Sequence, residues 1–170
     1  MLDLTRLETG MLELKKELFS LDELVNETVN DITYTNTKHS INIHTHFTGR
    51  VYGDKDRLGQ VLINLINNAI KYSIDNNQID VNIHQPENSL IAVSVKDYGI
   101  GINKTDQLKI FERFFRAGGK SEQTYAGFGI GLYIANEIIE RHQGFLSVES
   151  EKGEGSTFTF TLPLATANEI

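Results

Sequence analysis

Residues 58–73 form the stretch of this chain that most constrains its fold. At about 100° per residue, the apolar side chains of this stretch fall on one continuous arc: Leu58, Val61, Leu62, Leu65, Ile66, Ala69 and Ile70. Asn64, Asn68 and Lys71 fall together in a narrow stripe beside the arc, with Tyr72 at its border. The pattern predicts a helix that buries the arc against a core and holds two amides and a cation along its rim.

The polar stripe indicates a purpose other than helix stability. Asparagine is a poor helix former because its side chain competes with the backbone for hydrogen bonds. Asn64 and Asn68 nevertheless lie one turn apart, far from either helix end. Amide oxygens can ligate a hard cation such as Mg²⁺, and a lysine one turn later can contact a phosphate. For this helix alone, a solvated polar face is an equal alternative.

The composition is that of one ordinary globular domain. The chain has 170 residues, of which 39% are hydrophobic and 23% charged, so it has room for a real core. No apolar run approaches the roughly 18 residues of a membrane span. The absence of cysteine excludes disulfides and thiolate metal sites and fits a cytoplasmic location. The net charge of −7 argues against broad nucleic-acid binding, so a polyanion would need local partners such as backbone N–H groups, a few cations and a metal.

The first part of the chain predicts two helices and a strand. Residues 2–18 carry leucines and a methionine at spacings of three and four, without an N-cap, which predicts the end of a longer amphipathic helix. Ser20 and Glu23 form a capping box that begins a second helix through Ile32. Residues 41–47 alternate as a strand with His44 and His46 on one face. No third metal ligand is evident, so we expect exposed strand histidines.

The remainder of the chain alternates between strands and helices. We expect Asp54 to cap the central helix. A strand hairpin follows near residues 79–84 and 90–96, and then a short helix over 110–116, an unpatterned loop over 117–126 and a helix from Gly127 to about His142. Strands at 145–150 and 156–162 close the chain. This order predicts an α/β (α+β) two-layer sandwich, a mixed β-sheet covered on one face by helices.

A first glycine cluster lies just before the unpatterned loop. Gly99 and Gly101 follow a strand, and they let the backbone approach a ligand closely. Asp97 stands immediately before them. In a mostly apolar pocket, a lone carboxylate is a natural partner for an exocyclic amine such as adenine N6.

A second glycine cluster follows the loop. Gly127, Gly129 and Gly131 stand at a helix start, where N–H groups and the helix dipole suit a phosphate. Each cluster alone is weak evidence, because glycine turns are usually structural. Better-known phosphate motifs do not fit, since Leu132 and Phe114 occupy positions where a Rossmann fingerprint and a Walker A loop need glycine.

The order of these features is the strongest signal. The asparagine-rich helix is followed by D-x-G-x-G from Asp97, F-E-R-F-F-R from Phe111, G-F-G-I-G-L from Gly127 and G-E-G-S-T-F from Gly153. In this order the motifs closely resemble those of the catalytic, ATP-binding domain of sensor histidine kinases, within the superfamily shared with gyrase and the MutL repair proteins. The resemblance implies a Bergerat-type ATP-binding fold with a mobile ATP lid over about residues 103–126.

The resemblance also implies how the chain is divided. Residues 1–19 look like the C-terminal end of the second helix of the family's dimerisation hairpin. Residues 20–163 would be the catalytic domain, and residues 164–170 a tail or linker.

The resemblance implies a metal and phosphate side of the site. Asn68 would be the principal Mg²⁺ ligand, and Asn64 would support the metal and phosphate site. Lys71 would contact phosphate, and either Arg113 or Arg116 would reach the terminal phosphate. The residues that would close over the phosphates are Gly127, Gly129 and Gly131, with Leu132 beside them.

The resemblance implies a base side as well. Asp97 would accept the adenine N6 amine of ATP, in a pocket that Gly99 and Gly101 shape. Tyr72 would pack beside the nucleotide, and Thr157 would line the adenine side.

Position 64 separates two kinds of chemistry. In the superfamily's ATPases the equivalent residue looks to be Glu, a general base that activates water. Asn64 cannot accept that proton, so the γ-phosphate would be kept for another nucleophile. The resemblance implies that this nucleophile is a histidine on the dimerisation hairpin, followed by Glu or Asp, and none of the five histidines here has that neighbour. The chain would therefore be a phosphoryl donor without its acceptor, and a response regulator receiver domain would act downstream.

Two other classes compete with this interpretation. One is a slow ATPase or an anti-sigma-type serine kinase of the same superfamily, which Asn64 and the truncated leading helix disfavour. The other is a non-catalytic module whose nucleotide site serves to dock a partner. We expect this fragment to be a monomer without nucleic-acid or membrane contact, cut from a homodimeric parent; whether the parent is anchored in the inner membrane stays open.

Overall fold

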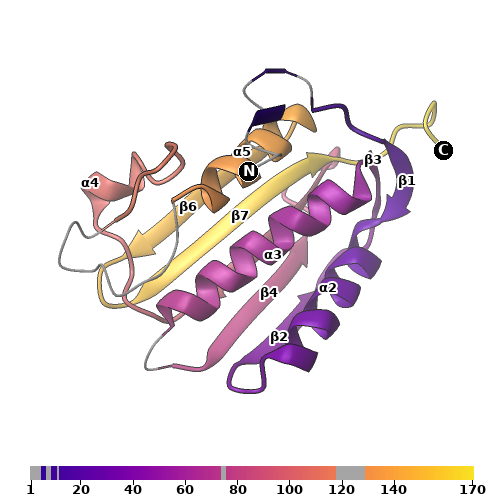
Figure 1. The fold of residues 1–170 in the computed structure, drawn as a ribbon. Helices are drawn as coiled ribbons and strands as arrows, with labels where there is room; N and C mark the ends of the chain where they lie inside the picture. Colours follow the sequence, from indigo (N-terminus) through magenta and orange to yellow (C-terminus); the bar gives the residue numbers. More distant parts are fainter. Residues whose placement is uncertain (1–4, 7–8, 11, 74–75, 118–128) are drawn as a thin grey trace.

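The computed structural model describes residues 5–6, 9–10, 12–73, 76–117 and 129–170. Its elements run in the order β1 (Glu17–Ser20), α2 (Leu21–Thr35), β2 (Ser40–Thr45), β3 (Arg50–Gly53), α3 (Lys55–Tyr72), β4 (Gln78–His84), β5 (Leu90–Asp97), α4 (Lys104–Gln107), α5 (Gly131–Arg141), β6 (Phe145–Glu151) and β7 (Gly155–Pro163) (Figure 1). Among these residues, no helix combines the length and the apolar character that crossing a membrane requires.

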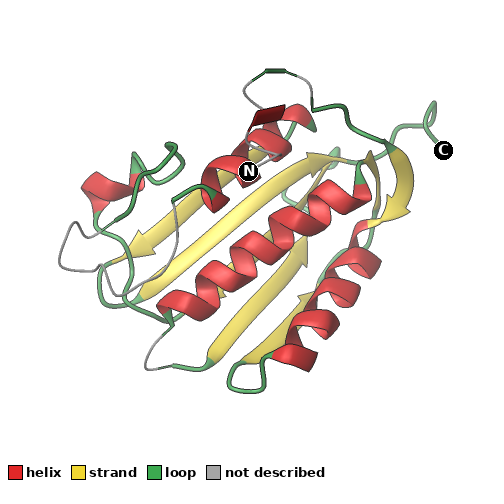
Figure 2. Cartoon of the chain, viewed as in Figure 1, coloured by secondary structure: helices red, strands yellow, loops and turns green. Residues whose placement is uncertain are grey.

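The main sheet has the strand order β2-β4-β5-β7-β6. β2 pairs with β4 in parallel, whereas the other neighbours are antiparallel. Helices α2, α3 and α5 lie together on one face of this sheet (Figure 2). Alternate strand residues such as Ile79, Val81 and Phe160 are fully buried, because successive side chains point to opposite faces. The predicted mixed sheet with one helical layer is confirmed.

Helix α3 lies across the middle of this layer. Its predicted arc is buried except for the half-buried Ile70, and Leu58, Leu62 and Leu65 are fully buried. Asp54 caps the helix, because its carboxylate accepts the backbone N–H of Arg57 at 3.1 Å. The core therefore fixes how the helix is rotated, and it leaves the stripe of amides on the rim.

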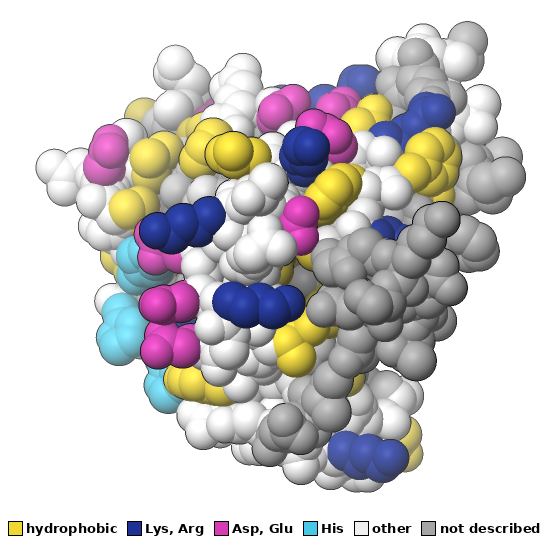
Figure 3. Space-filling view, turned by 90° about the vertical axis from the view of Figure 1, so that its left-hand side faces the viewer, with side chains coloured by type: hydrophobic (Ala, Val, Ile, Leu, Met, Phe, Trp, Pro, Cys, Tyr) yellow, Lys and Arg dark blue, Asp and Glu magenta, His cyan; other side chains and the backbone are white. Residues whose placement is uncertain are grey.

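The opposite face of the sheet is polar. Asp80 is only 8% exposed, and it accepts the Tyr98 hydroxyl at 2.6 Å and lies 3.2 Å from Nε2 of His44. Those hydrogen bonds lower the pKa of the Asp80 carboxyl, although burial alone would raise it. Histidine and acidic side chains gather at the left of Figure 3. The face without helices thus holds a carboxylate that accepts hydrogen bonds from neighbouring side chains.

The helix predicted over residues 2–18 is wrong in its second half. Gly10 has a φ of +69°, and Glu17–Ser20 forms β1, which pairs with β3 through the register Glu17↔Gly53. Phe19 is buried there. The three-and-four spacing of leucines therefore does not decide the structure, because strand pairing supplies the hydrogen bonds for these residues. Ser20 does precede α2, but its hydroxyl bonds the Asp22 carboxylate at 2.7 Å rather than a backbone N–H.

The short helix predicted over residues 110–116 is also wrong. The helix here is α4, and turns follow it. Phe114 has a φ of +62°, and its N–H bonds the carbonyl of Gly129, so it cannot continue a helix. Ile110 is buried, and the ring of Phe111 packs edge-on against Phe158 at 6.3 Å. The apolar spacing of this segment reflects packing onto the end of the sheet.

The predicted lid is described up to residue 117, and residues 118–126 lie outside the described part of the chain.

Candidate functional site

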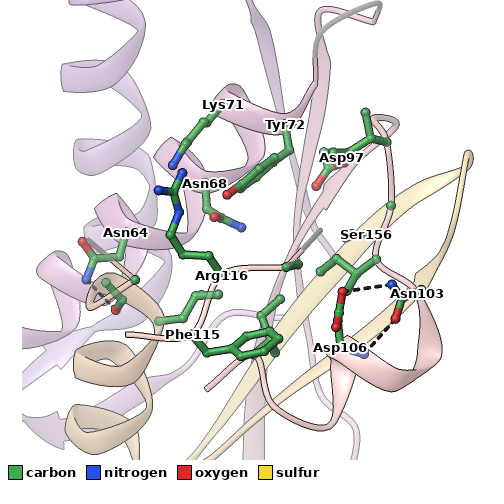
Figure 4. Close-up of a pocket in the computed structure, with 18 of the residues that line it drawn as sticks. Asn64, Asn68, Lys71, Tyr72, Asp97, Asn103, Asp106, Phe115, Arg116 and Ser156 are labelled. Atoms are coloured by element: carbon green, nitrogen blue, oxygen red, sulfur yellow. Dashed lines mark hydrogen bonds between the residues drawn. The ribbon is translucent and has the colours of Figure 1, made fainter. Parts of the chain in front are cut away.

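A cavity of about 240 Å³ lies beside the C-terminal half of α3. Figure 4 shows side chains converging on it from α3, from the end of β5 and from the segment after α4. The predicted site residues that line it are Asn64, Asn68, Lys71, Tyr72, Asp97, Gly101, Arg116, Gly129, Gly131 and Leu132. Motifs that are far apart in the sequence therefore meet in one place. Gly127, which was predicted to belong here, lies outside the described residues.

Asn64 connects α3 to the start of α5. Its amide nitrogen donates to the carbonyl of Gly131 at 3.1 Å. An amide ligates a cation only through its oxygen, so this bond leaves the ligating atom uninvolved. Asn68 lies one turn further along α3, beside Arg116 in Figure 4. The two amide side chains present neutral oxygen chemistry, which suits a hard cation that also has phosphate ligands.

Two cations share the same side of the cavity. Lys71 and Arg116 both line it, and they point toward one another in Figure 4. Burial, followed by the charge of Arg116, lowers the pKa of Lys71. Like charges held together in this way attract an anion, since an anion relieves their repulsion. Arg113 is not among the lining residues, and its guanidinium lies 4.7 Å from the centre of the Phe114 ring.

Asp97 supplies the other end of the cavity. It is 2% exposed, and its Oδ1 accepts the N–H of Gly99 at 2.9 Å. Burial raises the pKa of Asp97, while hydrogen bonds from the backbone of Gly99 and Ser156 oppose that rise. A carboxylate held in such a place is a strong acceptor for an exocyclic amine.

The first glycine cluster brings the loop after β5 close to other backbone. A Cβ on Gly99 would lie 1.9 Å from the carbonyl oxygen of Tyr72, the acceptor of the Ile100 N–H at 3.2 Å. Gly99 does not line the cavity itself, so its contribution is to seat the loop against the end of α3. Gly101 does line it.

The predicted contribution of Thr157 needs correction. Ser156 lines the cavity and Thr157 does not. Ser156 pairs in register with Asp97, and Thr157 pairs with Lys96, so Thr157 points to the other face of the sheet. The period of two was readable in the sequence, because inward Phe158 and Phe160 place Ser156 inward as well.

Some lining residues were not among the predicted site residues. Ile102, Ile110 and Phe115 add apolar surface, and Asn103 and Asp106 stand at the start of α4. The Asn103 side chain accepts the N–H of Asp106 at 2.8 Å and so caps that helix. The N-cap signature of Asn103 could have been found from the sequence, but its place in the same cavity as Asp97 could not.

The comparisons with known proteins agree with this geometry. Residues 53–166 match the model of the histidine kinase-, DNA gyrase B-, and HSP90-like ATPases, and the chain belongs to this family. Its fold is that of the ATP-binding catalytic domain of a histidine kinase. The predicted fold class and the resemblance are thus confirmed.

Several curated relatives are sensor kinases. The chain is 43% identical to sensor histidine kinase WalK of Bacillus subtilis over 111 residues, which are 65% of this chain and 18% of WalK. It is 32% identical to the circadian input-output histidine kinase CikA of Synechococcus elongatus over 173 residues, covering 99% of this chain and 23% of CikA. The chain therefore spans only a small part of these relatives.

Solved structures give the same result. The nucleotide-free catalytic domain of histidine kinase ThkA matches with a TM-score of 0.73 and 30% identity, over 90% of this chain and 97% of that one. Full-length ShkA in complex with AMPPNP matches with a TM-score of 0.81 and 25% identity, over 98% of this chain and 35% of that one. Nucleotide binding is thus a property of the family and of a structural relative.

Proposed function

We propose that this chain is the phosphoryl donor of a sensor histidine kinase, which binds Mg·ATP and delivers the γ-phosphate to a histidine on a dimerisation hairpin. One observation carries the proposal. A single cavity has amides and two cations at one end and a buried carboxylate at the other. Triphosphate with metal matches the first end, and an adenine amine matches the second.

The residues divide the work by their chemistry. Asn68 and Asn64 fit a magnesium ion, which when bound would neutralise phosphate charge. Lys71 and Arg116 bind phosphate oxygens, and the backbone at Gly129 and Gly131 stands where α5 begins. Asp97 orients the base, Tyr72 packs beside the nucleotide and Ser156 lies next to Asp97. Arg113 acts outside the cavity, on the lid.

The acceptor is proposed to come from elsewhere. Asn64 cannot act as a general base for water, which favours transfer over hydrolysis. His142 is an unsuitable nucleophile, because both of its ring nitrogens are engaged. We propose the dimerisation hairpin of the parent protein as the acceptor, with residues 1–19 as the approach from its second helix and a receiver domain of a response regulator downstream. Residues 164–170 would be a tail or linker, and the domain would work in the cytoplasm.

Lys71→Met should weaken ATP binding by about tenfold to a hundredfold, because a charge-assisted bond to phosphate is worth roughly 1.5–3 kcal/mol. Methionine keeps the apolar stem of the side chain in place. Lys55→Met is the matched control, since Lys55 starts the same helix far from the cavity and pairs with Glu27 at 3.4 Å. Titration calorimetry measures both affinities. Equal ATP affinities for the two variants would contradict the assignment of Lys71 to the phosphate site.

A further inference from the structure

His142 joins two helices through its ring. It follows the last residue of α5 and is 7% exposed. The backbone N–H of Asp54 lies 2.9 Å from Nε2, and Nδ1 lies 2.7 Å from the carbonyl of Ile138. Since an N–H group only donates, Nε2 is the acceptor. The proton therefore sits on Nδ1, which donates to Ile138, and the ring is neutral.

The start of the chain also contacts this place, which we call the joint: the ring of His142 together with Asp54 and Ile138. The carboxylate of Asp54 accepts the N–H of Arg57 within α3 and, on its other oxygen, the backbone N–H of Lys15 at 2.9 Å. The preceding residue, Gly53, packs so closely that a Cβ there would lie 2.8 Å from the His142 ring. The segment that enters the domain, the cap of α3 and the end of α5 thus meet at one buried point.

The N-terminal end of α5 is bonded to the middle of α3. α5 has 11 residues, so its first residue lies about 16 Å from the joint at about 1.5 Å per residue. There Gly131 accepts the amide of Asn64. The helices pack side by side (Figure 1). Two hydrogen-bonded contacts therefore hold α5 on α3, one at the end of α5 beside the phosphate site and one at His142.

We infer that His142 is a positioning residue for phosphoryl transfer, which in its neutral form holds α5 on α3 and so fixes the end of α5 that faces the phosphates. The inference rests on the proposed function. A displacement of that end by an ångström is enough to slow transfer strongly without abolishing nucleotide binding, because the reaction depends on alignment of the terminal phosphate.

The neutral form is favoured by the surroundings. Burial lowers the pKa of His142 and the charge of Lys16 lowers it further, whereas the Ile138 carbonyl and the Asp54 carboxylate raise it. Glu169 and Lys16 line a cavity of about 130 Å³ together with His142. Protonation in acid would place a second N–H against the N–H of Asp54. The joint should then open as the pH falls below the ordinary histidine range.

Two variants separate the two bonds of the ring. His142→Gln carries an oxygen that can replace Nε2 and accept the Asp54 N–H. His142→Asn can replace Nδ1 toward Ile138, but it leaves Asp54 unpaired. Each variant is compared with the unmodified protein by three measurements: the melting temperature, the affinity for Mg·ATP and the rate of labelled phosphoryl transfer to a supplied hairpin between pH 5 and pH 8.

We expect His142→Asn to stay folded and bind ATP within a few-fold, yet transfer at least about tenfold more slowly. His142→Gln should restore most of the rate and should lack the acid loss seen in the unmodified protein. Equal rates in the two variants, or a loss in His142→Asn fully matched by loss of the fold, would overturn the inference alone. If the unmodified protein transfers no label, the proposed function fails first, and the inference fails with it.

Discussion

Asp97→Asn should lower the affinity for ATP by about a hundredfold or more, while leaving the domain at least as stable as before. Asparagine keeps the oxygen that accepts the Gly99 N–H. Its amide nitrogen, however, would face the adenine amine with a donor in place of an acceptor. The stability follows from burial, which disfavours the ionised carboxyl in the folded protein.

The pH dependence of stability has a definite sign. Because the pKa of Asp97 is raised on folding, its ionisation costs stability as the pH rises from the ordinary carboxyl range through the folded value. Any gain in Asp97→Asn should therefore be present at neutral pH and vanish in acid. Urea denaturation at both pH values measures it.

Asp80→Asn is the matched control for Asp97→Asn. Asp80 is also buried, but it lies on the opposite face and its hydrogen bonds lower its pKa. Its stabilising contribution is present above the ordinary carboxyl range and is lost as the pH falls through the folded value. This variant should lose stability at neutral pH and bind ATP normally. Normal ATP binding by Asp97→Asn would refute the adenine assignment.

Gly101→Ala should destabilise the domain by about 3 kcal/mol or more and should also weaken ATP binding. Gly101 has a φ of +68°, and a Cβ there would lie 2.0 Å from the backbone carbonyl of Glu151. Backbone cannot move aside as a side chain can, so the loop after β5 must shift away from the β6–β7 turn. The cavity that this loop lines would change with it.

Gly153→Ala separates backbone strain from collision. Gly153 has a φ of +87°, but nothing lies within 4 Å of a Cβ there. Its cost should be the strain alone, about 1–2 kcal/mol. Urea unfolding of both variants gives the difference. If the two variants were equally stable, the close approach at Gly101 would have no energetic consequence.

The central helix and its site were predictable because their signals are local. The arc of α3 follows from spacing, and that arc fixes where Asn64, Asn68 and Lys71 point. The placement of Asp97 after a strand and before glycines is equally local. The order of the motifs carries the resemblance to histidine kinases, and that resemblance implied that these residues share one site although they are far apart in the sequence.

The errors arose where tertiary contacts decide. Residues 17 and 18 continue the helical spacing of residues 2–18, but they belong to β1, which pairs with β3, a partner that local sequence cannot reveal. The aromatic segment from Phe111 packs on the sheet end rather than forming a helix. The prediction named Thr157 where the structure places Ser156. A shift of one residue along a strand moves the side chain to the opposite face of the sheet. The joint at His142 links residues 88 positions apart and was not foreseen.

The most direct test of the proposed function follows γ-labelled ATP with Mg²⁺, with and without a separately supplied dimerisation hairpin. Free phosphate and protein-bound label are measured in parallel. We predict acid-labile label on the added hairpin only, with little free phosphate. Steady release of phosphate by the domain alone would contradict the proposal and favour a slow ATPase, and label on a serine would favour the serine kinase. Binding of ATP without turnover in either setting would also contradict it and leave a nucleotide-dependent docking module.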